Sequence, residues 1–482
     1  MDATLVGSII LGYFLFLIGI SFLTSKNANS SDFYIANKSS KWYLVAYGMI
    51  GASLSGVTFI SVPGEVANSN FHYFQVVLGY LLGYFVIGKV LLPLYYKLNL
   101  VSIYTYLEER FGFWSYKSGA FFFLISRVIG ASFRLFLVAG VLQITFFDAF
   151  KLPFWVSVLC TILLIWLYTF RGGIKTIVWT DTLQTSFMLI AVVVSIFFIK
   201  EELSWDWSAL SANLWNDQRS TIFNWEWQSG SNFFKQFSSG GFIAIVMTGL
   251  DQDMMQKNLT CKNIGEAQKN VLWFCIILVI VNFLFLSLGV LLYQFAEAAN
   301  ISIPERSDNL FPFLAVHHFS SLGSIVFLLG ITAAAYSSAD SALTALTTSF
   351  CIDFLGFKKE NFDKGKQLRV SIHFGFSVLL FLVILLFEAI NDQSVINSIF
   401  IAAGYTYGPL LGLFAFGILT PWKINDRWVP AVCLASPMLS YVININSESL
   451  LGGYKFGFEI LILNGLLMFL GLVLLRIRPE GG

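Results

Sequence analysis

Charged residues are scarce in this chain. Only 12% of the 482 residues are Asp, Glu, Lys or Arg, whereas 57% are hydrophobic and 50 are Phe. The mean hydropathy is +0.74. A soluble protein of this length has too little interior to bury so much apolar surface, so the composition excludes that class and predicts an all-α polytopic membrane protein.

Cysteine and histidine are also rare. The five cysteines show no C-x-x-C spacing, which argues against a disulfide framework or a zinc site. The four histidines show no ligand spacing with acidic residues, which disfavours a metalloenzyme. No G-x-x-x-x-G-K-[ST] loop, nucleic-acid patch or soluble domain is found, so we expect no ATP-driven transport, no nucleic-acid partner and no catalytic residues.

The first 23 residues are apolar but lack the marks of a cleaved signal peptide. Asp2 stands where such a peptide carries positive charge, and no A-x-A cleavage site follows. We therefore expect a retained first helix with the amino terminus outside.

Apolar runs separated by polar loops predict thirteen membrane spans. Of the 29 Lys and Arg residues, 19 fall in loops on one side of this arrangement, six in loops on the other and four within spans. Because positive loops stay in the cytoplasm, this asymmetry predicts a multi-pass protein of the plasma (inner) membrane with a cytoplasmic carboxyl terminus. The predicted spans are 3–23, 42–68, 75–96, 116–148, 152–170, 176–199, 236–253, 270–296, 320–353, 368–388, 394–419, 428–444 and 457–475.

Two of these spans contain residues that interrupt helices. The second holds several glycines and then Pro63-Gly64, and the seventh holds Gly240-Gly241 and Gly249. The two spans lie five apart. Interrupted helices at matching positions of two five-helix halves indicate an inverted-repeat transporter with a midplane site, although glycines also serve as packing faces.

The ninth span carries a ladder of oxygen atoms. On a helix, Ala334, Ser337, Ser338 and Ser341 follow the i, i+3, i+4, i+7 pattern, and Asp340 lies on nearly the same side. Hard oxygen ligands suit an alkali cation, and an intramembrane carboxylate indicates a functional site. The alternative is a helix-packing seam whose hydroxyls bond back to their own carbonyls, which leaves Asp340 unexplained.

Three motifs resemble one family. Ala334-x-x-Ser337-Ser338 is similar to the A-x-x-S-[ST] signature of the sodium/solute symporter family, which includes sodium/glucose, sodium/proline and sodium/sialic acid symporters. Residues 172–184 resemble its G-G-x-x-x-x-x-W-T-D-x-x-Q motif and residues 249–259 its D-Q-x-x-x-Q-R-x-L motif. The resemblance implies a LeuT-like 5+5 inverted-repeat core in a single transporter domain. The repeats would span 42–200 and 236–420, between a first peripheral helix and loop (1–41) and two further peripheral helices (421–482).

The resemblance also implies the ligand sites. The main sodium site would use carbonyls or hydroxyls of Gly51, Leu54, Ala334, Ser337 and Ser338. A second cation or proton site would use Asp181, Asp340 and Ser341, but Asp340 stands where family members have Ser. Two carboxylates there could bind a cation tightly, share a proton or be neutralised by an arginine. The solute pocket would include Ser53, Ser55 and Thr58, with Gln75, Arg134 and Asp251 as further candidates.

Arg127 and Arg134 share one face of the fourth span, separated by about 10 Å along its axis. Burying an unpaired guanidinium costs at least about 2.5–3.5 kcal/mol, so each should meet an anion. We expect Arg127 to close an ion-pair network with Asp340 and Asp181. Arg134 is expected to face a solute carboxylate, which a guanidinium binds bidentately; an internal ion pair is the alternative.

These features together predict secondary active transport. The expected activity is sodium-coupled uptake of a small polar, carboxylate-bearing organic solute by alternating access, with Na⁺, the solute and the lipid bilayer as partners. A proton-coupled symporter of the same fold is the alternative, motivated by Asp340 beside Asp181. A membrane enzyme and a transporter-like sensor are remote alternatives, since an acid pair with histidines or a signalling domain would be needed.

Overall fold

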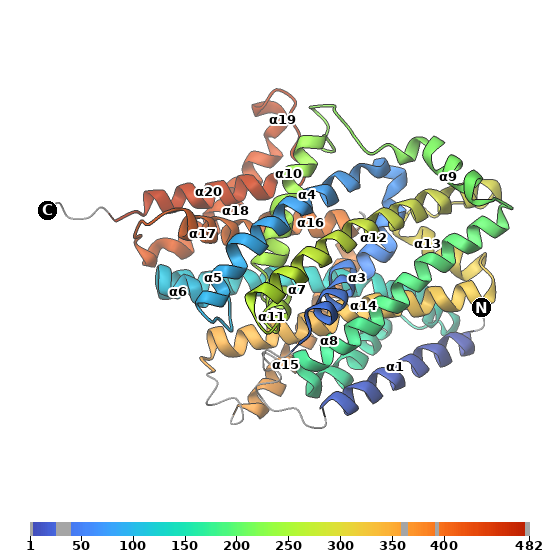
Figure 1. Ribbon diagram of the computed structural model, residues 1–482, viewed down its shortest axis with the longest axis horizontal. Helices are drawn as coiled ribbons and strands as arrows, with labels where there is room; N and C mark the ends of the chain where they lie inside the picture. Colours follow the sequence, from blue (N-terminus) through green and yellow to red (C-terminus); the bar gives the residue numbers. More distant parts are fainter. Residues whose placement is uncertain (1–2, 26–39, 358–364, 391–394, 478–482) are drawn as a thin grey trace.

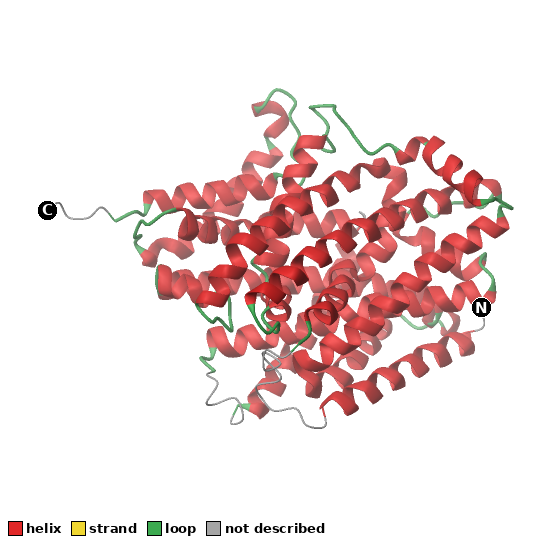
Figure 2. Ribbon diagram, in the orientation of Figure 1, coloured by secondary structure: helices red, strands yellow, loops and turns green. Residues whose placement is uncertain are grey.

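The computed structural model describes residues 3–25, 40–357, 365–390 and 395–477. Every regular element in these ranges is a helix, as predicted, and they form one bundle (Figures 1 and 2). The α-helices are α1 (Ala3–Ser25), α3 (Trp42–Ser69), α4 (Tyr73–Val86), α5 (Leu92–Lys97), α6 (Thr105–Arg110), α7 (Phe113–Thr145), α8 (Phe154–Glu202), α9 (Trp207–Asn216), α10 (Phe233–Ala244), α11 (Gln252–Asn258), α12 (Ile264–Ala298), α13 (Leu310–His317), α14 (Ser321–Ser349), α15 (Lys366–Ile390), α16 (Val395–Thr406), α17 (Gly408–Leu419), α18 (Val429–Ile445), α19 (Ser447–Leu450) and α20 (Ile460–Leu474). Three π-helical turns, η3 (Ile87–Leu91), η6 (Ile245–Gly249) and η8 (Phe350–Phe354), follow α4, α10 and α14.

The number of membrane spans differs from the thirteen predicted. Within the described residues, eight helices are long and apolar enough to cross a membrane, or nine if α16 and α17, bent by 48°, form one span. The eight do not include two shorter apolar helices, at Phe154–Trp166 and Ile460–Leu474. They count Trp42–Lys97 once, although this stretch contains both α3 and α4. The count of thirteen and the repeat boundaries therefore stay predictions.

Helix α3 is broken in its middle. Ser55 has φ 48° and ψ 176°, values outside the helical region, whereas Pro63 lies within the helix that follows. A non-glycine residue with positive φ is strained, and its neighbours lose helical hydrogen bonds. The predicted interruption of the second span is confirmed, and it lies at Ser55.

The break in the seventh span also differs from its prediction. Helix α10 passes through Gly240 without interruption, because this glycine serves close packing: a Cβ there would lie 2.0 Å from the Val76 carbonyl oxygen of α4. The interruption follows η6, where Asp251 has extended φ and ψ of −105° and 123°. The carbonyls of Gly249 and Leu250 at this break accept hydrogen bonds from Tyr95 and Tyr104, at 2.8 and 2.9 Å. The protein itself therefore satisfies them.

Helix α14 lies at the centre of the bundle. It packs against α3, α7, α8 and α15, and the Ser337 and Ser338 side chains are fully buried. Helix α1 lies along one edge of the bundle beside α8, whereas α18 and α20 lie at the opposite side (Figure 1). This arrangement brings the broken α3, the arginine-bearing α7 and the oxygen ladder of α14 together.

Candidate functional site

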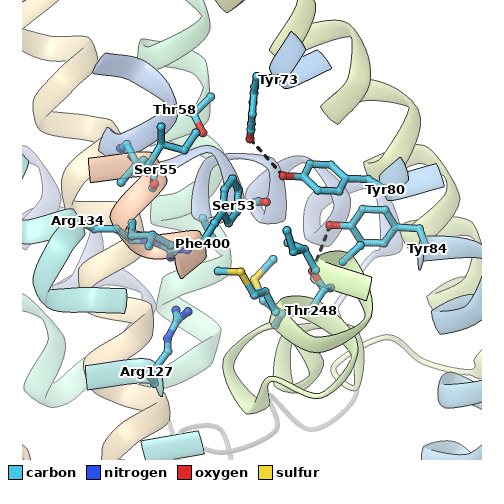
Figure 3. A pocket seen from close by; sticks show the side chains of 18 residues that line it. Ser53, Ser55, Thr58, Tyr73, Tyr80, Tyr84, Arg127, Arg134, Thr248 and Phe400 are labelled. Atoms are coloured by element: carbon cyan, nitrogen blue, oxygen red, sulfur yellow. Dashed lines mark hydrogen bonds between the residues drawn. The ribbon is translucent and has the colours of Figure 1, made fainter. Parts of the chain in front are cut away.

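A cavity of about 80 Å³ lies beside the break in α3 (Figure 3). Four of the six residues predicted to bind solute line it: Ser53, Ser55 and Thr58 from α3, and Arg134 from α7. In the close-up view, Arg134 extends from α7 into the cavity beneath Ser55. The broken helix and the guanidinium therefore form one wall.

Three tyrosines of the α4 segment face that wall across the cavity (Figure 3). The hydroxyls of Tyr73 and Tyr80 are hydrogen-bonded at 3.2 Å, and the Tyr84 hydroxyl lies 3.1 Å from Thr248 Oγ1. Apolar side chains complete the lining, namely Val57, Ile243, Met247, Met254, Ile396, Ile399 and Phe400. The cavity thus suits a solute with one charged end, some hydroxyl-bonding groups and an apolar part.

Arg134 has no anionic partner among the residues that the structure describes. Its Nε is buried without a hydrogen-bond partner, and no carboxylate of the described residues forms an ion pair with it. An uncompensated guanidinium beside a cavity is a ready site for an anion. The internal pair that the sequence left open as an alternative is not found within the described part of the chain.

Arg127 also lines this cavity, but its charge is neutralised by carboxylates of the protein. It forms an ion pair with Asp253, and its Nη1 lies 3.8 Å from Asp251 Oδ2. Asp253 also accepts a hydrogen bond from Ser341, and Asp251 accepts one from the Tyr407 hydroxyl at 2.7 Å. This network links α7, α11, α14 and the start of α17 directly below the cavity.

The partner predicted for Arg127 needs correction. Asp181 of α8 pairs instead with Lys257 of α11, whose Nζ lies 2.8 Å from Asp181 Oδ2, and both side chains are about 1% exposed. Lys257 was placed in a cytoplasmic loop by the sequence, although it belongs to the motif at 249–259. A buried lysine needs a carboxylate partner, and the fold supplies the one on α8. The expected partner Asp340 has its side chain outside the described residues.

Two predicted solute residues lie outside the cavity lining. Asp251 is fully buried, and its carboxylate caps α11 by accepting from the backbone amides of Asp253 and Met254. Gln75, in the first turn of α4, is fully buried against the loop that precedes α10: its Nε2 donates to the Ser231 carbonyl at 3.0 Å and its Oε1 accepts from the Asn224 amide at 3.2 Å. Both polar groups are used within the protein, so neither faces the cavity.

The five residues predicted for the main sodium site lie buried where α3, α8 and α14 meet. A Cβ added to Gly51 would lie 3.4 Å from Ser337 Oγ, which shows how closely α3 approaches α14. Ser337 Oγ donates to Asp181 Oδ1 at 2.7 Å, and Ser338 Oγ donates to the Ala334 carbonyl at 3.0 Å. Donation of the hydroxyl protons leaves both serine oxygens with lone pairs for a cation. Leu54, the fifth residue, directly precedes the strained Ser55.

The predicted second cation site is divided in this structure. Asp181 is shared between Ser337 and Lys257, whereas the Ser341 hydroxyl donates to Asp253. The side chain of the third residue, Asp340, lies outside the described part. Asp253 and Lys257 were not predicted as site residues, although both belong to the motif at 249–259.

Comparisons with known proteins identify relatives of this chain. The chain is similar to the sodium/sialic acid symporter NanT of Aliivibrio fischeri, with 24% identity over 425 residues that cover 83% of this chain and 80% of the relative. It is also similar to the sodium-coupled monocarboxylate transporter 1 of Mus musculus, with 25% identity over 451 residues that cover 89% of this chain and 71% of the relative.

The fold matches that of a solved Na⁺-coupled sialic acid symporter in a substrate-bound outward-open state. The TM-score is 0.80 at 19% identity, and the match covers 97% of each chain. At this identity the likeness shows the fold, which is the predicted LeuT-like one. Residues 33–427 match the sequence model of the family described as SSF, and the chain therefore belongs to the sodium:solute symporter family.

Proposed function

We propose that this protein takes up a small monocarboxylate together with sodium, and that Arg134 binds the carboxylate. The observation that carries the proposal is the contrast in charge around the cavity. Arg127 is matched by Asp251 and Asp253, whereas Arg134 has no carboxylate partner among the described residues. A guanidinium at the cavity that has no direct carboxylate partner favours a solute that brings a carboxylate.

The size and lining of the cavity support a small solute. Its volume of about 80 Å³ is below the roughly 300–1,000 Å³ of pockets for drug-sized ligands. The relatives named above act on sialic acid or on monocarboxylates by their names, and both are acids. The cavity volume favours the smaller class for this chain.

Sodium is proposed to bind where the break in α3 faces α14. Its ligands would be the carbonyls of Gly51, Leu54 and Ala334 and the hydroxyls of Ser337 and Ser338. The strained Ser55 links the two sites, because it follows Leu54 directly and also lines the cavity. Sodium at Leu54 would hold the broken segment in the conformation that presents Ser53, Ser55 and Thr58 to the solute.

We further propose that one sodium ion accompanies each solute. Lys257 already supplies a positive charge to Asp181, which reduces the attraction of that carboxylate for a second cation. The role of Asp340 stays a prediction. We expect a Hill coefficient near one for the sodium dependence of uptake. A value near two would contradict this proposal and support a second sodium site at Asp181, Asp340 and Ser341.

The protein is proposed to lie in the plasma (inner) membrane with its amino terminus outside and its carboxyl terminus in the cytoplasm. The distribution of Lys and Arg among the loops supports this orientation. Cysteines placed at each terminus and labelled from one side with an impermeant reagent would test it.

The decisive test is a thermal-shift screen of the purified protein with lactate, propionate, sialic acid and glucose, with and without sodium. We expect stabilisation by a small monocarboxylate only in sodium, and none by glucose. Uptake of the stabilising acid into proteoliposomes should then follow an imposed sodium gradient. Full uptake driven by a proton gradient without sodium would replace sodium coupling by proton coupling.

A further inference from the structure

A second cavity, distinct from the solute cavity, lies on the outer surface of the bundle between the α4 segment and α12. This groove measures about 510 Å³ and is mainly apolar. Its walls include Leu81, Phe85, Leu272 and Ile276, which are 46%, 63%, 59% and 38% exposed. These side chains belong to membrane-spanning helices and face outward, so the groove opens to the hydrocarbon phase.

Two glycines and a π-helical turn create the groove. A Cβ on Gly88 would meet no atom within 4 Å, and one on Gly265 would meet only the Asn263 side chain at 3.4 Å. The floor is therefore open rather than packed. Gly88 lies in η3, and its carbonyl oxygen accepts a hydrogen bond from Gln268 Nε2 at 2.8 Å. This bond joins the two walls at one level and keeps the two helices from separating there.

Two lysines lie next in sequence to the hydrogen-bonded residues Gly88 and Gln268. Lys89 of η3 and Lys269 of α12 both line the groove and are exposed. Neither forms an ion pair with a carboxylate of the described residues. Lys89 precedes the end of α5 by eight residues and Lys269 follows the start of α12 by five, which corresponds to about 12 Å and about 8 Å along the axes. Their side chains are long enough to reach the membrane surface.

The lysine-bearing ends of both helices lie at one face of the bundle. The Tyr96 hydroxyl near the end of α5 donates to the carbonyls of Asn258 and Cys261, each at 3.1 Å. The groove is therefore apolar toward the membrane interior and positively charged toward the surface. Two ammonium groups can share the phosphate oxygens of one headgroup, and the apolar walls can hold an acyl chain below it.

We propose that this groove binds an anionic phospholipid, whose phosphate lies between Lys89 and Lys269 and whose acyl chain lies along Leu81, Phe85 and Leu272. A zwitterionic lipid matches the apolar walls but brings a positive group next to two lysines. The unmatched charge of the groove therefore selects for net negative headgroups. The site is separate from the sodium and solute sites and does not depend on the identity of the solute.

Native mass spectrometry of the full chain, titrated with phosphatidylglycerol or phosphatidylcholine of the same acyl chains, tests the proposal. Phosphatidylglycerol should bind more tightly than phosphatidylcholine. The Lys89→Gln, Lys269→Gln double variant should lose about thirtyfold in affinity for phosphatidylglycerol, from roughly fivefold per lysine near a membrane surface, and should no longer distinguish the two lipids.

Two further variants separate the groove from general charge. Lys423→Gln with Arg427→Gln removes two exposed charges outside the groove and should leave the affinity unchanged. Gly88→Leu fills the open floor but keeps both lysines, and it should weaken binding at least tenfold. Thermal unfolding confirms that each variant is folded. Equal affinity for the two lipids, an equal loss in the control variant, or full binding by Gly88→Leu would each overturn the proposal.

Discussion

Two arginines on one helix face have opposite surroundings. Arg127 and Arg134 both line the solute cavity from α7. Arg127 lies in a closed network with Asp253, Asp251, Ser341 and Tyr407, whereas Arg134 has a buried Nε without a partner. The same residue type, seven positions apart, is therefore structural in one place and available to a ligand in the other. The difference lies in which helices end next to each guanidinium, not in the arginines themselves.

The two breaks in the helices differ in a similar way. At the break after η6, tyrosine hydroxyls satisfy the freed carbonyls, so that break is closed within the protein. At the break in α3, Ser55 lines a cavity, and Gly51 in the preceding turn lies close to Ser337 of α14. Of these two breaks, only the one in α3 borders the cavity, and the proposed sites use the groups around it.

Arg127→Ala is expected to have the largest effect, because it leaves two buried carboxylates without their cation. Breaking such a pair costs about 3–5 kcal/mol of stability. Thermal unfolding in detergent should show a large fall in Tm. Arg127→Ala combined with Asp253→Asn should recover part of the loss. An unchanged Tm in the single variant would show that the network does not hold the helices together.

Arg134→Ala should show the opposite pattern, with little loss of stability and a large loss of solute affinity. Removal of an unpartnered guanidinium should leave the Tm of the solute-free protein unchanged or raise it, because a buried cation is lost. Affinity for a stabilising monocarboxylate should fall by about 2–5 kcal/mol, which is on the order of thirtyfold or more, while sodium binding persists. Arg134→Lys should restore part of the affinity. A fall in Tm as large as that of Arg127→Ala would assign Arg134 a structural role.

Ser337→Ala and Ser338→Ala are expected to raise the sodium concentration needed for solute-dependent stabilisation. Each loses one oxygen ligand, worth about 1–1.5 kcal/mol or roughly tenfold. Ser324→Ala on the same helix is the matched control, since its hydroxyl donates to the Ala315 carbonyl at 2.7 Å away from the site. An unchanged sodium requirement in both serine variants would remove them from the sodium site.

Gln75→Ala should have the smallest effect and separates loop anchoring from solute binding. Loss of its hydrogen bonds to the loop around Asn224 and Ser231 should cost about 1 kcal/mol of stability. Solute affinity should stay unchanged, whereas Ser53→Ala in the cavity wall should lower it. Equal losses of affinity in the two variants would return Gln75 to the solute site.

Much of the site was predicted because it depends on residues close together in sequence. The oxygen ladder of α14 follows from helical periodicity, and the interruption of the second span follows from its glycines. Ser53, Ser55 and Thr58, which were predicted to bind solute, line the cavity because they flank that interruption. The location of the break at Ser55 was not predicted, since a serine with positive φ is held there by its surroundings rather than by its own preference.

By itself, the sequence determined that the chain is an all-helical membrane protein of one family, with two interrupted spans and buried charges that need partners. Only the tertiary structure decided which charges meet. Lys257 reaches Asp181 over a separation of 76 positions, and Arg127 reaches Asp253 over 126. The rotation and depth of each helix set these pairs, and they result from packing along the whole helix. A local sequence pattern predicts that a buried charge must be paired, but not across which helix interface.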